Sequence, residues 1–409
     1  MNLLGSLVYQ FKIGLDLIVK YDALTIDTQV IYSNDLELDT GLVGQLSQFK
    51  DGLVKFLLSE ITVRELHKPL NDKAKSTLDA LNKAIKSGQS NRQFTEQQIL
   101  DLEGTRDAMV KPYKHAASQL SEFAARTGAE MIAADTVDVK SLLDRYFKNE
   151  APFASKSKKN EFPDAIALLT LECWAIQKQK RILAISNDGD WKSFADQSEY
   201  IDVVEDLGKA LSILNELAEE TIPLAQNVLA LLSAPDPDPD LTGRIQSLLE
   251  SAVEAESPYI EFDGPMPGED EGACLSLVDF EITGLDDHST KIDIVRVGTQ
   301  GFAFRVPVHI TANVHVEISF SIRDSIDKDY VPMGSTSVEQ ETEFDAFLLL
   351  EISHFLNDEE DDTSIIYNID NVELLNSPSS IDLGYIDYSL AEPDYDFEIE
   401  HMLEDHERR

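Results

Sequence analysis

The stretch FPDAIALLTLECWAIQKQKRILAISND, residues 162–188, joins an expected buried helix to an expected strand. Pro163 stands at a first helical position, where its missing N–H donor is not needed, and the residues after it are apolar nearly all round. RILAIS then reads as a short apolar strand that ends at Asp188. A buried helix that leads directly into a strand is typical of a parallel α/β sheet.

The same alternation continues on both sides of this stretch. Further strands are expected at residues 23–26, 54–59, 129–135 and 200–204. Helices are expected at residues 60–85, from about 95 to 126 with a bend at Pro112, and at 137–147 and 205–217. Strands that alternate with helices in this way predict a mostly parallel sheet covered on both faces.

The second half of the chain changes to a β pattern. Residues 219–256 read as helices interrupted by SAPDPDPD, Ser233–Asp240, whose alternating Pro and Asp predict a stiff extended linker. From about Pro258 apolar and polar residues alternate, most clearly in VHVEISFSI, residues 314–322. This alternation indicates half-buried antiparallel strands and predicts a sandwich or barrel-like domain.

Four segments follow from these patterns. We expect an α/β domain at residues 1–218, a helical linker at 219–256, an acidic β-rich accessory domain at 257–395 and an acidic tail at 396–409. At 409 residues the chain is too long for one ordinary core, which agrees with two domains.

Apolar runs and cysteines indicate the cellular compartment in which the protein is expected. No window approaches the roughly 18 uninterrupted apolar residues of a membrane-spanning helix, and no basic stretch precedes the apolar residues at the N-terminus. We therefore expect a soluble protein without a signal peptide or membrane contact. Cys173 and Cys274 are far apart and complete no zinc motif, which favours the reducing cytoplasm.

The acidic charge is concentrated in the second half. Residues 1–210 contain 26 Lys and Arg against 31 Asp and Glu, whereas residues 211–409 contain 8 against 45. A strongly acidic surface repels nucleic acid, so the second half is expected either to weaken indiscriminate binding or to serve solubility alone. The near-neutral first half is not expected to repel nucleic acid in this way. Its basic stretch SKSKKN, Ser155–Asn160, is expected to be either a solvated loop or a phosphate contact.

Five acids are placed to meet at one edge of the expected sheet. Ligands of open parallel sheets bind beyond the carboxyl ends of the strands, and the acids expected at that edge are Asp27, Glu65, Asp164, Asp188 and Asp190. Each also has an ordinary reading as a turn residue, a residue favoured by a helix dipole or a solvated side chain. Together they would repel one another unless a cation lay between them, and all-oxygen ligation favours Mg²⁺ or Mn²⁺.

The order and spacing of TIDTQVI, LLSEITVREL, KKNEFPDAIALLTLE and ILAISNDGDW resemble the PIN-domain nucleases. The similarity covers roughly residues 20–218 and is to the larger PIN-like branch with a helical insertion between the second and third strands; the C-terminal half resembles no family. It implies a Rossmann-like fold and a metal-dependent endonuclease, usually acting on RNA. By motif, Asp27 and Asp188 match the acids that hold the metal directly, Asp164 the third carboxylate and Glu65 the fourth, and the resemblance implies that these four are catalytic. Asp190 is an accessory acid of the same motif, and the implied metal ligands are Asp27, Asp164, Asp188 and Asp190.

This chemistry needs no histidine base, because carboxylates hold the ions and an ion activates water. The sequence contains no GxSxG, GxxxxGK[ST] or GxGxxG motif, which leaves serine hydrolysis, P-loop chemistry and dinucleotide binding without support. Two alternatives remain open. One is a non-catalytic PIN-like binding protein, and the other is a phosphatase with an aspartyl nucleophile, although DTQ lacks an acid two residues after Asp27.

Nucleic acid is expected as substrate, RNA before DNA, with a toxin-like or antiphage defence role suggested by analogy alone. The acidic second domain is expected to sense, restrain or recruit, through a protein partner or regulator. The sequence does not specify what triggers activity or how many metal ions bind. A monomer and a homo-oligomer are both compatible with it.

Overall fold

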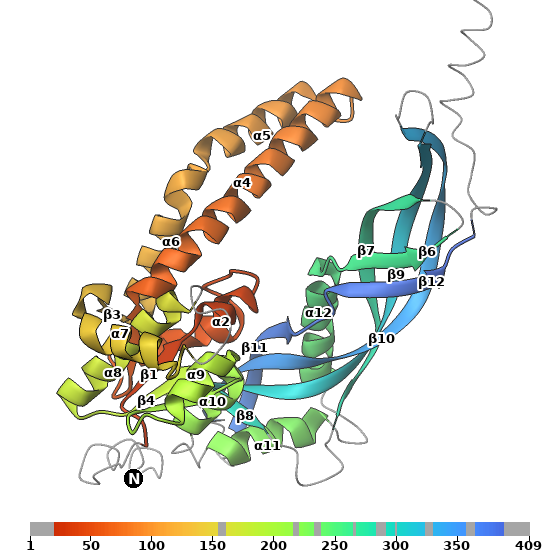
Figure 1. Cartoon of the computed structure of the whole chain (residues 1–409). Helices are drawn as coiled ribbons and strands as arrows, with labels where there is room; N and C mark the ends of the chain where they lie inside the picture. Colours follow the sequence, from red (N-terminus) through yellow and green to blue (C-terminus); the bar gives the residue numbers. More distant parts are fainter. Residues whose placement is uncertain are drawn as a thin grey trace, which may run out of the picture. The chain divides into compact units, whose positions relative to one another are not determined.

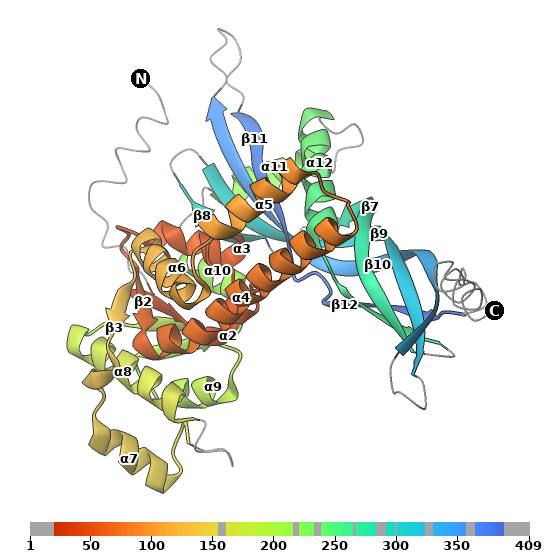
Figure 2. The same cartoon turned by 90° about the horizontal axis from the view of Figure 1, so that it is seen from above.

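The computed structural model describes residues 20–153, 161–215, 221–232, 239–264, 267–283, 292–298, 301–323, 330–356 and 365–387. The chain forms two compact units, residues 1–217 and 218–409, whose elements are labelled in Figure 1 and seen from above in Figure 2. Predictions made for Ser155–Asn160, for Ser233–Asp238 and for the tail at 396–409 lie outside the described residues. Within the described part, no helix is long and apolar enough to cross a membrane.

A five-stranded parallel sheet forms the centre of the first unit, which confirms the predicted fold class. Its strands are β1 (Ala23–Ile26), β2 (Lys55–Ser59), β3 (Glu130–Ile132), β4 (Ile182–Ile185) and β5 (Ile201–Val204). The order is β3-β2-β1-β4-β5, so the chain leaves β1 toward one edge and later returns to build the other edge from β4. The carboxyl ends of β1 and β4 therefore border the topological switch point, where open parallel sheets bind their ligands.

Buried helices and strands make the core of this unit. Every residue of β1 and β4 is buried, and α8 (Phe162–Lys178) packs its apolar side chains onto the sheet, as its sequence predicts. The unit also contains α2 (Thr28–Tyr32), α3 (Gly41–Gly44), α7 (Val139–Lys148), α9 (Gly189–Ala195), α10 (Leu207–Leu214) and the short 3-10 helices η1 (Gln45–Phe49) and η2 (Ala134–Thr136).

Three helices between β2 and β3 form an arm. They are α4 (Glu60–Ser90), α5 (Glu96–Ala108) and α6 (Pro112–Thr127). Ser59 caps α4, since its hydroxyl accepts a hydrogen bond from the Ile61 amide at 3.2 Å. Both views show α4 and α5 side by side, running away from the sheet (Figures 1 and 2). At the tip, a Cβ on Gly88 would lie 2.1 Å from the Phe94 ring, so glycine is required for the close approach.

The predicted single helix from about 95 to 126 is wrong, because the chain breaks at Pro112 rather than bending there. Helix α5 ends at Ala108, and Lys111 before α6 has an extended backbone. Proline disfavours a helical conformation in the residue before it and has no N–H to continue the helix. It therefore starts a new helix at its favoured first position.

The second unit is built on an antiparallel sheet, as predicted. Its path is β11-β10-β9-β7, with β8 also paired to β9, while β12 and β6 form a separate parallel pair. The strands are β6 (Tyr259–Asp263), β7 (Gly268–Ile282), β8 (Asp293–Val297), β9 (Gly301–Arg323), β10 (Tyr330–Leu356), β11 (Ile365–Leu375) and β12 (Ser380–Tyr385).

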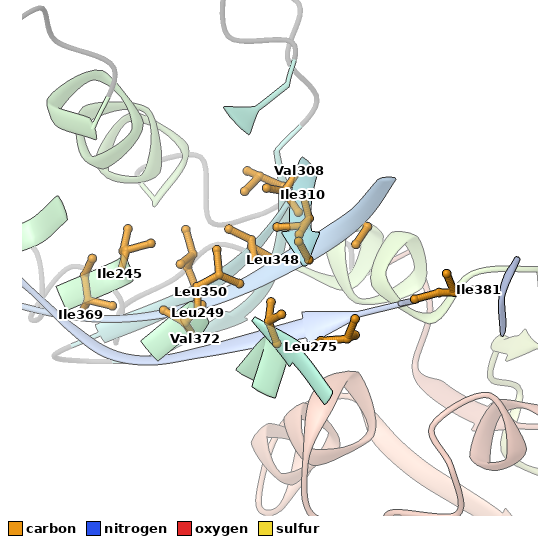
Figure 3. Close-up of a cluster of buried hydrophobic side chains, with 14 of the residues drawn as sticks. Ile245, Leu249, Leu275, Val308, Ile310, Leu348, Leu350, Ile369, Val372 and Ile381 are labelled. Atoms are coloured by element: carbon orange, nitrogen blue, oxygen red, sulfur yellow. The ribbon is translucent and has the colours of Figure 1, made fainter. Parts of the chain in front are cut away.

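One face of this sheet packs onto helices. The predicted helices at 219–256 are α11 (Thr221–Leu232) and α12 (Pro239–Ala255), and their apolar residues join the core of the sheet rather than forming a free connection. Ile245 and Leu249 of α12 lie among strand residues such as Leu350 and Val372 in Figure 3. The predicted sandwich or barrel is therefore not observed: these helices and the β6–β12 pair supply the apolar residues that pack against the sheet.

The predicted alternation along β9 is observed. Its even-numbered residues from Phe302 to Phe320 are all buried, and the alternation ends at Ile322, which is 43% exposed. On the opposite face Arg305, 3% exposed, donates a hydrogen bond from Nη2 to Asp293 Oδ2 at 2.7 Å and lies over the Phe347 ring. This buried ion pair joins β8 to β9, where Asp293 and Arg305 are directly opposite each other in the strand register.

Candidate active site

Asp27 and Ser186 directly follow the neighbouring strands β1 and β4. Because Ile26 and Ile185 are paired in register, the next residues emerge together at the switch point. The Asp27 amide donates to Ile185 O at 2.9 Å, and Asp27 Oδ2 accepts a hydrogen bond from Ser186 Oγ at 2.7 Å. Asp27 is only 6% exposed. Strand pairing therefore fixes a buried carboxylate at the centre of the rim.

Ser186 also positions Asp188. Its Oγ accepts a hydrogen bond from the Asp188 amide at 3.0 Å, and the Asp188 carboxylate accepts one from the Asp190 amide at 2.6 Å. Asp188 is thus the N-cap of α9, where a carboxylate satisfies an otherwise unpaired backbone donor. One serine hydroxyl links the acids that follow two different strands.

Glu65 reaches the site from the base of the arm. It lies on α4, and its Oε2 accepts a hydrogen bond from Thr28 Oγ1 at 2.6 Å. Thr28 directly follows Asp27 and is buried, whereas Glu65 is exposed. The contact holds the glutamate at the same rim as Asp27.

Asp164 lies in the first turn of α8 and is held by Trp191. The indole Nε1 of Trp191, which is buried in α9, donates to Asp164 Oδ1 at 3.1 Å. The helix dipole also favours a carboxylate at this position. Helices α8 and α9 are therefore connected at the point where each presents an acid.

Burial and mutual repulsion perturb these acids. Burial raises the pKa of Asp27, and the charges of Asp188 and Glu65 raise it further, against the lowering effect of Ser186. Burial raises the pKa of Asp164 to about 6, and the charges of Asp27, Glu65 and Asp188 act in the same direction. Burial and Asp188 also raise the pKa of Asp190. Such effects require that the carboxylates lie near one another.

No basic side chain offsets this charge within the described part of the chain. The ion pairs there include none to Asp27, Glu65, Asp164 or Asp188. A cluster of uncompensated carboxylate oxygens suits a hard divalent cation. Among the described residues, however, no three His, Cys, Asp or Glu side chains are already grouped closely enough to hold a metal ion. The oxygens fit Mg²⁺ or Mn²⁺ by type, and binding requires the carboxylates to turn toward a common point.

The structure brings four predicted acids into electrostatic contact and leaves Asp190 at the edge, interacting with Asp188. Sequence reasoning missed the residues that hold them, namely Ser186, Thr28 and Trp191. Two of these adjoin an acid in the motifs TIDT and SNDGDW, which was the available signal. A side chain's role in orienting an acid depends on rotamers that no motif specifies. The catalytic and metal-binding roles of the acids stay predictions.

Comparison with protein families finds a match for the part of the chain that carries the candidate site. Residues 24–191 match a PIN domain. The match begins in β1, ends at Trp191 and contains all five acids, while no family model matches the C-terminal half. No curated protein and no solved structure matches the chain. The resemblance inferred from the sequence is thereby confirmed for the PIN domain.

Proposed function

We propose that the PIN domain is a metal-dependent endonuclease that hydrolyses phosphodiester bonds, most readily in RNA. The observation that carries the proposal is the gathering of four carboxylates, from four separate segments, at the switch point of a PIN domain. PIN domains are generally nucleases, and they typically use divalent metal ions. Acids crowded together without a counter-charge destabilise a fold, so their presence at one rim favours a functional reason.

The residues divide the work by position. Asp27, Asp164 and Asp188 would hold the cation, with Asp190 supporting it through its neighbour. A bound Mg²⁺ or Mn²⁺ lowers the pKa of water and stabilises charge on the departing oxygen. Ser186 and Trp191 orient the carboxylates through the hydrogen bonds described above. Glu65, exposed and hydrogen-bonded by Thr28, would orient a water molecule at the rim.

The substrate, the biological role and the second unit extend the proposal. RNA is preferred over DNA by the resemblance to PIN nucleases, and a toxin-like or antiphage role in the cytoplasm rests on analogy. The acidic second unit is proposed to sense, restrain or recruit, because its charge opposes the approach of a polyanion.

A substrate panel tests the proposal. End-labelled single-stranded RNA, tRNA and single-stranded DNA are incubated with the purified chain in Mg²⁺, Mn²⁺ or EDTA. Asp27→Asn is the matched control, because it removes one charge with almost no change in volume. Cleavage that needs the metal and is lost in Asp27→Asn supports the assignment.

The alternative is a non-catalytic PIN-like binding protein. It predicts that RNA is bound but never cut, and that Asp27→Asn binds as the parent chain does or more tightly. Metal-independent cleavage, or equal cleavage by both chains, would contradict the nuclease assignment.

A further inference from the structure

One edge of strand β10 is open over residues 337–345. Strand β9 pairs with β10 along almost its whole length, whereas β11 pairs only with Phe347–Leu356. Among the described strands, none is paired with residues 337–345 on the side of β11, and the odd-numbered residues there are all exposed. An open strand edge presents a row of unpaired N–H and C=O groups that can pair with another chain.

The strand register shows which backbone groups face this open edge. The Pro307 carbonyl of β9 accepts a hydrogen bond from the Thr283 amide, at the end of β7, at 3.1 Å, so odd-numbered residues of β9 turn their backbone groups toward β7. Even-numbered residues of β9 therefore face β10, where each lies opposite an even-numbered residue, as Val308 does opposite Ala346. The odd-numbered residues of β10 turn their N–H and C=O groups to the open edge.

The same odd-numbered residues carry negative charge. They include Glu339, Glu341, Glu343 and Asp345, and β10 contains no Lys or Arg. His309 lies 2.8 Å from Asp345 and 3.7 Å from Glu343, but no ion pair of the described residues involves Glu339 or Glu341. A second copy paired along this edge would place acid opposite acid, which is destabilising. A partner of opposite charge suits the edge better.

The other face of the same edge is partly apolar. Val338 and Phe344 are partly buried and pack against the core of the second unit. Side chains of an added strand would alternate between this apolar face and the face that carries the acids. The partner that suits both faces is an extended segment in which Lys or Arg alternates with apolar residues.

We propose that residues 337–345 bind such a segment of a partner protein as an added antiparallel strand. In this mode of recognition, backbone hydrogen bonds supply the affinity and alternate side chains select the partner. The inference rests on the proposed recruiting role of the second unit for its purpose, but it does not require cleavage by the PIN domain. Charge on an edge strand also prevents aggregation, so the experiment must distinguish binding from simple protection of the edge.

Peptide binding to the full chain, in EDTA and without nucleic acid, tests the added strand. The probe is a labelled peptide of alternating Lys and Val, as long as the open edge, and fluorescence anisotropy measures its binding. N-methylation of the lysine amides, which face β10 in an antiparallel pairing, should weaken binding by more than about 10-fold. N-methylation of the valine amides, which face away, should leave binding unchanged. A peptide with Glu in place of Lys should not bind.

A double variant tests the charge on the edge. Glu339→Gln with Glu341→Gln should weaken binding of the Lys–Val peptide by about 5-fold, because two cross-strand charge pairs are lost. The matched control is Glu261→Gln with Asp263→Asn, which removes the same charge at the same spacing from exposed residues of β6. The control should bind the peptide as the parent chain does.

Hydrogen exchange locates the bound peptide. The amides of Glu339, Glu341 and Glu343 should exchange rapidly in the free chain and slowly with the peptide bound. Slow exchange of these amides in the free chain overturns the proposal, since the chain itself or a second copy then covers the edge. Equal binding of the two methylated peptides, or equal loss in both double variants, also overturns it, because charge alone then attracts the peptide. Binding with the expected pattern by a chain that cuts no RNA supports the added strand and contradicts only the nuclease.

Discussion

Asp27 in the PIN domain and Asp293 in the second unit are buried equally, each 6% exposed, yet their surroundings are opposite. Asp293 accepts a hydrogen bond from the guanidinium of Arg305, itself 3% exposed. Asp27 accepts one from the neutral hydroxyl of Ser186. The charged groups near Asp27 are carboxylates, which raise its pKa. Burial alone therefore does not distinguish a structural acid from a functional one.

The difference lies in the charge that accompanies each acid. A buried acid paired with arginine is neutralised within the fold, so removing either partner leaves a buried charge alone. An acid grouped with other acids leaves repulsion in the fold, which only an external cation relieves. Replacing Asp with Asn should therefore destabilise the second unit at Asp293 and stabilise the PIN domain at Asp27.

The largest expected effect is on the buried ion pair. Arg305→Met should destabilise the second unit by about 3–5 kcal/mol, because Asp293 is left charged and unpaired in the interior. Urea unfolding followed by far-UV circular dichroism measures the change. Both tryptophans, Trp174 and Trp191, belong to the first unit, so unchanged tryptophan fluorescence is the internal control. Adding Asp293→Leu should restore most of the loss, and a single variant as stable as the parent would remove the contrast.

The next effect is on catalysis. Asp27→Asn and Asp188→Asn should each lower the rate of RNA cleavage by more than about 100-fold, equivalent to about 2.7 kcal/mol. The expectation follows because even residues that only support a metal ligand commonly contribute 10- to 100-fold. Initial rates in saturating Mn²⁺ measure it. Asp382→Asn, an acid of the second unit, is the matched control and should cleave normally.

A smaller effect, of opposite sign to Arg305→Met, is expected for Asp164→Asn. The pKa of Asp164 is raised from 3.8 to about 6 in the folded chain, so the folded state binds the proton more tightly. The resulting stabilisation is fully present below pH 3.8 and is lost as the pH rises through 6. At pH 7.5 the asparagine variant should be more stable by about 1–2 kcal/mol, a figure reduced for solvent screening.

Most of that advantage should disappear at pH 4, where the carboxyl is protonated in the folded state. Tryptophan-detected unfolding at both pH values gives the comparison. A variant that is destabilised at pH 7.5 would mean that the hydrogen bond from Trp191 outweighs the repulsion among the acids.

The smallest effect is the response to metal. Mn²⁺ at five times its Kd should stabilise the PIN domain by about 1 kcal/mol, or roughly 2–4 °C in Tm. The quadruple variant Asp27→Asn, Glu65→Gln, Asp164→Asn, Asp188→Asn should not respond. Its control removes four acids that alternate along β10: Glu339→Gln, Glu341→Gln, Glu343→Gln, Asp345→Asn. If the control alone loses the response, the ion binds the second unit.

The sequence was sufficient for the sheet and for its acids, since both depend on local patterns. Short apolar strands ending in Asp27 and Asp188 imply a shared rim, because parallel strands end at the same edge. It was not sufficient for Ser186 or Trp191, whose hydrogen bonds cross between segments far apart in the chain. Those contacts depend on strand register and on rotamers that only the packed core determines.

The second unit shows the same limit. Alternation along residues 314–320 predicts which side of β9 is buried, but not what buries it. The ion pair between Asp293 and Arg305 forms because β8 pairs with β9 in one antiparallel register, which shifts just after Ile294. Such a register cannot be inferred from composition. Helices α11 and α12 were predicted as helices, yet their place on the sheet depends on the chain's path.

The tip of the arm has a consequence for how this protein can vary among its relatives. Gly88 and Phe94 are in close contact at the end of the α4–α5 pair that lies far from the sheet. Two antiparallel helices keep the same contacting faces when each gains or loses about seven residues, or two turns. The reach of the arm can therefore change by insertion or deletion at its end, while Glu65 at its base keeps its place.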